Sequence, residues 1–287
     1  MVILSADRTC DLNEELLEQY DVHTIPYHIL LGEKEYFDNV DVDIFDVYRY
    51  YDEHKVLPKT SAVSPGEYAA YFESLLKDDD TEVVHFSLGS SLSTSYQSCI
   101  AAASAYEGRV FIIDAKNLSS AVGLQVLDAG DMIKQGKSAA EIYDYFTTHN
   151  QCYHASFVLG TLEYLRAGGR CSAMAAFSAS LLNIRPCVVV DNTTGGMDVF
   201  KKYRGSTEKV LKKYAREELG RFSDVKTDKV FVTDSGFPAE ITDMVEQVVL
   251  EELPFEKVYH ARSSCTISSH CGPNCLGVLF VTESPAK

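Results

Sequence analysis

Four short polar segments, far apart in the sequence, carry side chains that could bind a negatively charged ligand. They are Lys59-Thr60-Ser61, the serine-rich run Ser90–Tyr96, Gly168-Gly169-Arg170 and the run Ile267–Pro273, which contains His270. Hydroxyl and imidazole groups donate hydrogen bonds, and arginine adds a fixed positive charge. Together these side chains could hold a carboxylate or a phosphate, although each segment alone also has an ordinary structural explanation.

The serine-rich run lies where a predicted strand ends and a predicted helix begins. The strand covers 82–87 and the helix extends to about Tyr106. The first backbone N–H groups of a helix have no partner within it, and the helix dipole favours negative charge at that end. Ser93 and Thr94 are therefore candidates for binding an anion, while capping of the helix explains their hydroxyls equally well.

Thr60 and Ser61 lie in a segment with no evident capping duty. The following helix already has a strong start in Ser64-Pro65-Gly66-Glu67, which combines a capping box with proline at the first helical position. Residues 58–61 are therefore predicted to be irregular chain that leads into this helix. Their two hydroxyls are left free to donate to a ligand.

His270 and Arg170 are the candidates for a positive partner of the ligand. We predict that His270 lies in a loop before Cys271-Gly272-Pro273, where its ring stays open to a ligand. A protonated ring would also supply a countercharge, whereas a purely structural hydrogen bond is the alternative. Arg170 follows two glycines that let the backbone turn. Its guanidinium suits a carboxylate, a phosphate or a surface glutamate.

Three other chemistries fit the same residues less well. A metal cluster of His270, Cys271 and Cys275 lacks a fourth ligand unless Cys265 joins it. A hydrolase with Ser93 as nucleophile and His270 as base lacks the Gly-x-Ser-x-Gly elbow. No Walker A or Gly-x-Gly-x-x-Gly motif is present, so spacing gives nucleotide binding no support. We expect no metal site, no cofactor and no catalysis.

The elements that must position these residues alternate between strand and helix in the first half, which predicts a mostly parallel sheet. The second half reads as α+β, with a hairpin between 186–190 and 197–203. We predict an α/β fold of two domains, residues 1–155 and 156–287. Further strands are expected near 2–4, 23–31, 36–37, 82–87, 110–114, 155–159, 229–233, 257–260 and 277–281. One helix is expected to begin after an N-cap at Asp11. Further helices are expected near 43–51, from 64 onward, near 94–106 and 119–134, from 138 onward, and near 162–167, 206–221 and 238–251.

Bulk composition narrows the class of partner. The 287 residues include 26 Lys and Arg against 42 Asp and Glu, a formal charge of −16. Such an acidic chain repels nucleic acid and anionic membrane surfaces, so we expect neither as a partner. No apolar run reaches membrane-spanning length, and the N-terminus does not read as a signal peptide. A cytoplasmic location with reduced cysteines is expected.

Taken in order, these segments resemble the DegV family, bacterial fatty-acid-binding proteins that partner a fatty-acid kinase. The resemblance covers nearly the whole chain, and the ordered set is more specific than any single piece. The matching pieces are Asp7–Leu12, Ile25-Pro26, Tyr36-x-Asp38, Pro58–Ser61, Ser64–Glu67, Tyr96–Ser98, Thr161–Leu165, Gly168–Arg170, Leu181-Leu182-x-Ile184-x-Pro186 and His270-x-Gly272-Pro273.

The resemblance implies a long-chain fatty acid in a tunnel between the two domains. The implied role is to present the carboxylate to the kinase, which forms an acyl phosphate, so this chain would be a carrier rather than an enzyme. A hydrolase or acyl transferase, and a regulatory binding protein for another small carboxylate, remain the alternatives. The residues implied to bind the carboxylate are Thr60, Ser61, Ser93, Thr94 and His270, with Arg170 at the head-group end or the kinase interface.

Two pieces depart from the family pattern. Ser93-Thr94-Ser95 stands where the family has Ser-Gly-Thr, and Ser268–Asn274 stands where it has Gly-Thr-His-Thr-Gly-Pro-Gly. The Thr94 side chain replaces a glycine, so we expect the backbone to approach the ligand less closely there. Hydroxyl and histidine chemistry is largely kept.

Overall fold

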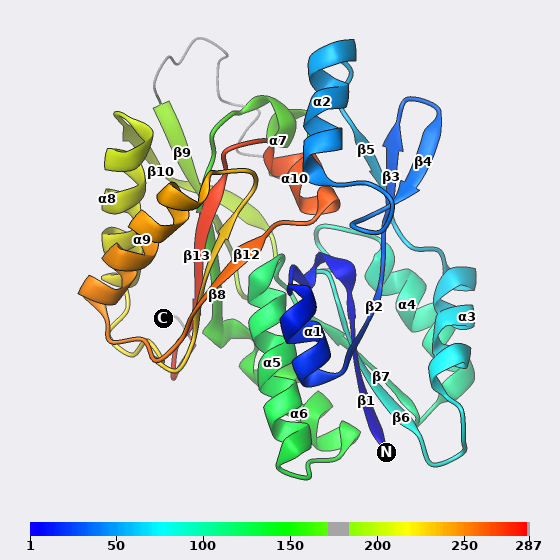
Figure 1. The fold of residues 1–287 in the computed structure, drawn as a ribbon. Coiled ribbons are helices and arrows are strands. Elements are labelled where there is room, and N and C mark those ends of the chain that lie inside the picture. Colours follow the sequence, from blue (N-terminus) through cyan, green and yellow to red (C-terminus); the bar gives the residue numbers. More distant parts are fainter. Residues whose placement is uncertain (172–183, 286–287) are drawn as a thin grey trace.

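The computed structural model describes residues 1–171 and 184–285. It has the predicted mixed α/β fold, with two sheet-based halves side by side (Figure 1). The division near residue 155 stays a prediction; the chain changes sheets between a strand that ends at Asp114 and one that begins at Tyr153. No helix within the two described stretches has the length and apolar character needed to cross a membrane. Leu181 and Leu182, in one of the matching pieces, lie outside the described residues.

A four-stranded parallel sheet forms the centre of the N-terminal half. Its elements are β1 (Val2–Asp7), η1 (Arg8–Cys10), α1 (Glu14–Tyr20), β2 (Val22–Ile25), α3 (Pro65–Leu75), β6 (Glu82–Ser87), α4 (Ser95–Ala103), η2 (Ser104–Tyr106), β7 (Val110–Asp114), α5 (Ser120–Lys134) and α6 (Ala139–His149). The strand order is β2-β1-β6-β7, and every pair is parallel, which confirms the prediction. In Figure 1, α5 and α6 lie on one side of the sheet and α3 and α4 on the other.

A small antiparallel sheet extends from this half toward the C-terminal half. It consists of β3 (His28–Leu31), β4 (Lys34–Phe37) and β5 (Lys59–Ser61), in the order β4-β3-β5, and α2 (Ile44–His54) lies in the connection between β4 and β5. The single strand predicted over 23–31 is wrong, because the chain leaves the first sheet at Pro26, which has no N–H for a ladder. The irregular chain predicted at 58–61 is also wrong at its end, because β5 pairs with β3.

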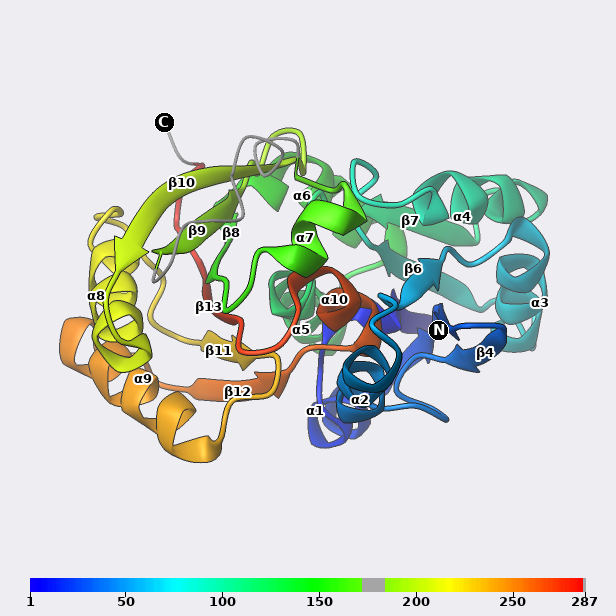
Figure 2. The same ribbon diagram turned by 90° about the horizontal axis from the view of Figure 1, so that it is seen from above.

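A six-stranded sheet forms the C-terminal half. Its elements are η3 (Asn150–Cys152), β8 (Tyr153–Val158), α7 (Glu163–Gly168), β9 (Ile184–Val190), β10 (Met197–Arg204), α8 (Thr207–Leu219), β11 (Val230–Asp234), α9 (Ala239–Glu252), β12 (Val258–Arg262), α10 (Cys265–Cys271) and β13 (Leu276–Val281). The order is β10-β9-β8-β13-β11-β12, and all neighbours are antiparallel except β11 and β12. Figure 2 shows α8 and α9 together on the outer side of this sheet.

The helix α10 corrects the prediction for His270. The residue lies in the last turn of this seven-residue helix rather than in a loop. The helix ends at Gly272, whose positive φ of 73° suits glycine. α10 follows β12 of the C-terminal half, yet it contacts α2, β3 and β5 of the N-terminal half. The histidine is therefore carried to the boundary between the two halves.

Of three predicted helix starts, those at Ser64 and Ser138 are confirmed as capping boxes. Ser64 and Ser138 each accept a hydrogen bond from the N–H three residues on, and each receives the reciprocal glutamate. The third prediction, an Asp11 cap, is wrong because Asn13 caps α1 instead. The Asp11 carboxylate turns inward and accepts hydrogen bonds from the Ser119 hydroxyl and the Ser264 N–H.

The described residues form more than one apolar cluster, and one of these contains buried side chains from both halves. The helix α5 lies within it, because this helix contacts β1 and β6 on one side and β8, β11 and β13 on the other. A polar link crosses the same boundary: Lys229 Nζ lies 2.5 Å from Asp128 Oδ1 and 3.1 Å from Asp131 Oδ2, both on α5. The two halves therefore have a packed and ion-paired interface.

Candidate ligand-binding site

The six residues singled out from the sequence all line one polar pocket. Its volume is about 520 Å³, and it lies where β5, the Ser93 loop and α10 meet. Hydroxyl groups dominate its wall. The predicted residues in the wall are Thr60, Ser61, Ser93, Thr94, Arg170 and His270. Segments separated by up to 210 residues in the sequence are thus brought together.

Thr60 and His270 are in direct contact. Thr60 Oγ1 lies 3.0 Å from His270 Nε2, a hydrogen-bond distance between β5 of the N-terminal half and α10. The other ring nitrogen, Nδ1, is buried and has no hydrogen-bond partner among the described residues. Gly168 packs against it so closely that a Cβ there would lie 2.4 Å from Nδ1. A buried polar atom without a partner is costly, and the close packing of Gly168 leaves no room for a ligand atom at Nδ1 in this structure.

His270 is uncharged at neutral pH in this structure. Burial, and then the positive charge of Arg170, lower the pKa of His270 to about 4. The condition for a countercharge from His270, a protonated ring, is therefore not met in the ligand-free protein at neutral pH. Arg170 is the cationic side chain among the described residues that line the pocket.

The Ser93 loop combines a structural role with a place in the pocket wall. Ser93 Oγ accepts from the Ser95 N–H and donates to Ser95 Oγ, both at 3.1 Å. Thr94 occupies the N-cap position of α4, but its hydroxyl makes no capping hydrogen bond. Ser90 anchors the loop, because its N–H and hydroxyl both donate to Asp114 at the end of β7.

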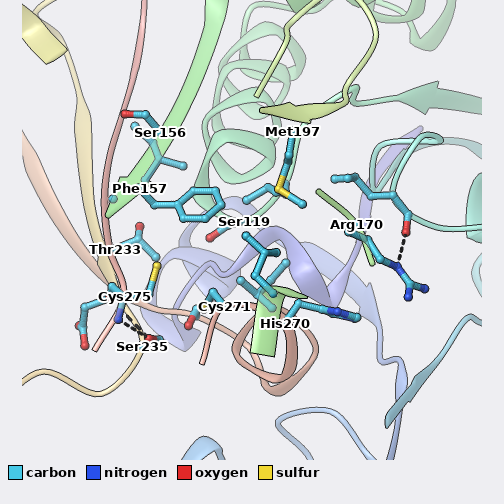
Figure 3. A pocket seen from close by; sticks show the side chains of 18 of the residues that line it. Ser119, Ser156, Phe157, Arg170, Met197, Thr233, Ser235, His270, Cys271 and Cys275 are labelled. Atoms are coloured by element: carbon cyan, nitrogen blue, oxygen red, sulfur yellow. Dashed lines mark hydrogen bonds between the residues drawn. The ribbon is translucent and has the colours of Figure 1, made fainter. Parts of the chain in front are cut away.

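Arg170 stands beside this loop at the mouth of the pocket. Its Nε donates to the Leu92 carbonyl at 3.3 Å (Figure 3). One terminal nitrogen donates to the Gly168 carbonyl at 2.7 Å. No carboxylate partner holds the guanidinium in the described part of the chain. Both acceptors are neutral carbonyls, so the positive charge remains available for an anion.

An apolar cavity of about 80 Å³ adjoins the polar pocket, between the two halves. Phe157 and Met197 face it, together with leucines from the N-terminal half (Figure 3). Several hydroxyl-bearing residues also line it, but these hydroxyls are already bonded within the protein. The bonded groups are Ser119 to Asp11, Ser156 to Tyr214, Thr233 to Ser120, Ser235 to Gly272 and Ser263 to Ser268.

The polar pocket and the apolar cavity share three wall residues, Leu92, Arg170 and His270. Hydroxyl groups line the pocket on one side of these residues, and an almost wholly apolar surface lines the cavity on the other side. Arg170 itself carries the positive charge at the boundary. Such an arrangement suits an amphiphile with an anionic head and a hydrocarbon tail. The head would meet unsatisfied donors, and the tail would be removed from water.

Thr266 and Tyr27 are among the wall residues that the sequence did not single out. Thr266 lies on α10 one turn before His270, and its buried hydroxyl has no hydrogen-bond partner among the described residues. Tyr27 follows Ile25-Pro26, and its hydroxyl donates to the buried Asp7 at 2.9 Å. Thr266 and His270 are four residues apart, a spacing that places two side chains on the same face of a helix. This spacing could have indicated Thr266, but a loop was predicted at His270 rather than a helix.

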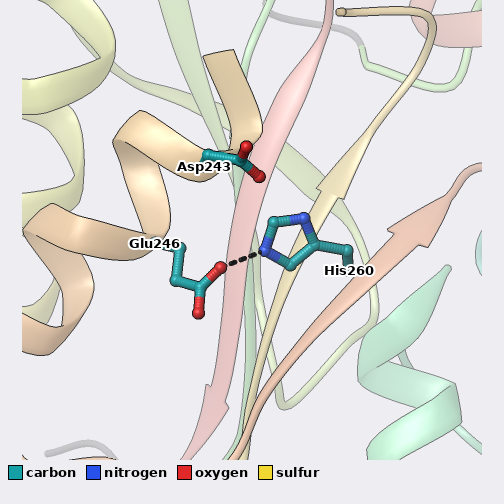
Figure 4. Close-up of side chains that lie close together, drawn as sticks. All are labelled: Asp243, Glu246 and His260. Carbon is teal, nitrogen blue, oxygen red and sulfur yellow. Dashed lines mark hydrogen bonds and ion pairs between the residues drawn. The ribbon is translucent and has the colours of Figure 1, made fainter. Parts of the chain in front are cut away.

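The alternative chemistries find little support in the geometry. Ser93 bonds to Ser95, and His270 bonds to Thr60, so the nucleophile–base pair of a hydrolase is not formed. In the described residues, the group with metal-binding geometry is not the His270–Cys275 cluster. It consists of Asp243, Glu246 and His260 on α9 and β12, with ligand atoms within 4.8 Å of one another (Figure 4). His260 there is already paired with Glu246.

Sequence comparison finds relatives over the full length of the chain. The model of the DegV family, described as an uncharacterised protein, matches residues 2–283. A DegV domain-containing protein of Caldanaerobacter subterraneus subsp. tengcongensis is 28% identical, and the match covers 97% of this chain and 98% of that protein.

Solved structures share the fold over the same length. A DegV family protein from Thermus thermophilus, with fatty acid binding, has a TM-score of 0.87 at 25% identity and covers 98% of this chain and 99% of its own. The fatty-acid-binding DegV of Bacillus subtilis has a TM-score of 0.82 at 25% identity, with coverage of 98% and 99%. A stearic-acid-binding protein from Eubacterium ventriosum has a TM-score of 0.82 at 26% identity, with coverage of 99% and 99%.

Proposed function

The chain belongs to the DegV family, and on this premise we propose that it binds a long-chain fatty acid between its two halves. The carboxylate occupies the polar pocket and the tail occupies the apolar cavity. The observation that carries the proposal is the contact between the two spaces at Leu92, Arg170 and His270. Fatty acid binding by the three solved relatives supports it.

The pocket supplies the groups that a buried carboxylate needs. Thr60, Ser61, Ser93 and Thr94 offer hydroxyl donors, His270 offers a ring nitrogen, and the guanidinium of Arg170 places a positive charge at the mouth of the pocket. A carboxylate transferred from water without such partners would be strongly disfavoured. Charge-assisted hydrogen bonds are also stronger than neutral ones. The head group therefore fixes the orientation of the ligand.

The tail supplies most of the affinity. Each methylene moved from water to an apolar wall contributes roughly 0.8 kcal/mol, so a chain of about 16 carbons gains about 11–12 kcal/mol before costs. Association and side-chain ordering offset a large part of this gain. The described cavity is about 80 Å³, below the roughly 300 Å³ at which ligand pockets usually begin. We therefore expect flexible wall residues such as Met197 to move when the tail enters.

The mouth of the pocket suits transfer of the carboxylate to a second protein. Ser61, Thr94 and Arg170 are exposed there. We propose that the chain is a carrier that presents the carboxylate to a fatty-acid kinase, which forms the acyl phosphate. Arg170→Ala is expected to slow phosphorylation more than it weakens fatty acid binding; an equal loss of both would place Arg170 on the carboxylate instead.

The test of fatty acid binding begins with the protein as purified. Mass spectrometry after gentle denaturation should release a stoichiometric acyl chain, and the delipidated protein should take up palmitate. Ser61→Ala, Ser93→Ala and His270→Ala should each weaken palmitate binding by about 1–3 kcal/mol, since each removes a donor from a buried charge.

The matched control is Ser104→Ala, an exposed serine whose hydroxyl bonds only to the Ala101 carbonyl; it should leave the affinity unchanged. Protein that releases no acyl chain and takes up no palmitate would exclude the carrier function. Unchanged affinity in all three pocket variants would place the head group elsewhere. Ester hydrolysis that disappears in Ser93→Ala would favour the hydrolase instead.

A further inference from the structure

The N-terminal end of α10 is held by two buried carboxylates from the N-terminal half. Asp38 Oδ1 accepts from the Cys265 N–H at 2.7 Å, and Asp38 Oδ2 accepts from the Thr266 N–H at 2.9 Å. Asp11 accepts from the preceding Ser264 N–H at 2.9 Å. Both carboxylates are less than 5% exposed, so water cannot replace them as acceptors. Backbone amides that a helix leaves unpaired are thus satisfied from outside its own domain.

The opposite end of the same helix meets the same small sheet. Asp38 directly follows β4, and its N–H donates to the Tyr27 carbonyl just before β3. Thr60 lies on β5, which pairs with β3 at Ile29, and it contacts His270 in the last turn of α10. The small sheet β4-β3-β5 therefore contacts α10 at both ends, through Asp38 at the N-terminal end and Thr60 at the C-terminal end.

We propose that Asp38 is a positioning residue for the head-group pocket: it fixes α10 to the small sheet and so places His270 and Thr266 against Thr60. The inference rests on the proposed function, because it assigns Asp38 a role in binding the carboxylate. Asp38 itself does not line the pocket. Its effect is transmitted through a helix of seven residues.

The shortness of α10 explains why an anchor is required. A helix of two turns is marginal alone, because nucleation fixes several residues for each hydrogen bond gained. A carboxylate at its N-terminus also complements the helix dipole. Without Asp38, two buried amides lose their acceptors and the first turn has no restraint on its position. A displacement of about 1 Å at His270 is enough to spoil head-group contacts.

The decisive variant is Asp38→Asn, which keeps the shape and one acceptor oxygen but removes the charge. Its matched control is Asp43→Asn. Asp43 caps α2 by accepting from two backbone amides in the same way, but no residue of α2 lines the pocket. Each variant is titrated with palmitate and with hexadecanol, which has the same tail and no carboxylate. A general loss of stability would weaken both ligands, whereas a misplaced head-group pocket weakens palmitate alone.

We expect Asp38→Asn to weaken palmitate binding at least tenfold and hexadecanol binding less than twofold, with Asp43→Asn within twofold for both. Equal losses for the two ligands, or no loss, would overturn the positioning role. Thr60→Val supplies a second readout: if Asp38 acts through the His270 contact, the palmitate losses of Asp38→Asn and Thr60→Val are not additive in the double variant. Fully additive losses would also contradict it.

A readout without ligand separates this inference from the proposed function. The ring nitrogen signals of His270, assigned with His270→Gln, report the contact with Thr60. They should shift in Asp38→Asn and not in Asp43→Asn. If the wild-type protein binds no palmitate, the carrier function fails, and these signals still decide whether Asp38 positions His270. If Asp38→Asn does not fold, Asp38→Ser, which keeps a hydroxyl acceptor, is measured in its place.

Discussion

Two polar clusters, one inside the N-terminal half and one at the boundary between the two halves, differ in whether their hydrogen bonds are complete. The first surrounds the buried Asp7 at the end of β1. Its carboxylate accepts from Tyr27, Tyr68, Ser87 and His85, and from the Leu88 N–H. Burial raises the pKa of Asp7, but the hydrogen bond and charge of His85 and the other donors outweigh it, so the pKa lies below its ordinary value.

The second cluster is the head-group pocket, and a histidine in each shows the contrast. Both ring nitrogens of His85 are bonded, Nδ1 to Ser5 Oγ at 2.8 Å and Nε2 to Asp7 at 3.2 Å. His270 has one ring nitrogen bonded and one without a partner in the described residues, and the hydroxyl of nearby Thr266 also lacks one. The Asp7 cluster contains its own anion, whereas the pocket holds donors arranged for an anion that the chain does not supply.

This difference in hydrogen bonding predicts which side chains contribute to the stability of the fold and which contribute to ligand binding. Donors that meet a carboxylate of the protein itself stabilise the fold, and their loss is felt on unfolding. Donors without a protein acceptor add little to the fold and are available to a ligand. Tyr27 belongs to both clusters, since it lines the pocket and donates to Asp7. Variants of the two clusters should therefore have opposite profiles of stability and affinity.

The largest expected effect is on stability, from Asp7→Ala. The change leaves the surrounding donors without an acceptor in a site closed to water. We expect the free energy of unfolding to fall by about 3–5 kcal/mol, as when one partner of a buried charged group is removed. Urea denaturation followed by circular dichroism measures it. A loss below about 1 kcal/mol would mean that the cluster relaxes, and the contrast between the two regions would fail.

The next effect is on affinity, from His270→Ala. We expect palmitate binding to weaken by about 1–3 kcal/mol, with a smaller change in the free energy of unfolding, because this ring has only one hydrogen bond to lose. Isothermal titration with palmitate and urea denaturation of the same preparation give the two numbers. A larger loss in stability than in affinity would assign His270 to the structural class of His85.

A smaller effect is expected in the pH dependence of stability. The pKa of His270 is about 4 in the folded protein, below about 6.5 in an unfolded chain. As the pH falls through this window, the unfolded chain takes up the proton first, so folding loses stability by at most about 1.4 kcal/mol per pH unit. His270→Gln should reduce the slope by the share of this one histidine, because burial also lowers the pKa of His154 to about 4. His23→Gln, at an exposed position, should leave the slope unchanged. Identical slopes in wild type and His270→Gln would contradict the lowered pKa.

The smallest effect is expected from Thr94→Gly, which restores the family's residue. Thr94 occupies the N-cap position of α4 without a capping hydrogen bond, and replacement of a cap residue by glycine costs only a few tenths of a kcal/mol. Thermal unfolding should change little, and palmitate affinity should change by less than about threefold if the other hydroxyls dominate. A tenfold gain would show that the Thr94 side chain restricts the approach of the ligand.

The parts of the fold that the sequence predicted are those with local signals. Ser64 and Ser138 begin capping boxes whose partners lie three residues away, and both formed as predicted. The strand β5 and the helix α10 were missed because their partners lie elsewhere in the chain. β5 consists of three residues that pair with β3, and α10 begins at amides held by Asp38 and Asp11.

The candidate site shows the same division. The residue types at Thr60, Ser93, Arg170 and His270 indicated an anion site, and the structure brings them into one pocket. The neutral state of His270 could not be read from the sequence, because it depends on burial and on the position of Arg170. Asp11 was misassigned as a cap for the same reason: its partners, Ser119 and Ser264, are distant in sequence.

The wall shared by the pocket and the cavity has a kinetic consequence. If Leu92, Arg170 and His270 form the neck between the two spaces, every carbon of the tail must pass them during entry and release. Residence time should then lengthen with the number of carbons, while the head-group contacts stay the same. A slow release of this kind would keep the lipid in place while its exposed end is modified. The rate at which the ligand leaves would then depend on passage through the neck rather than on equilibrium affinity.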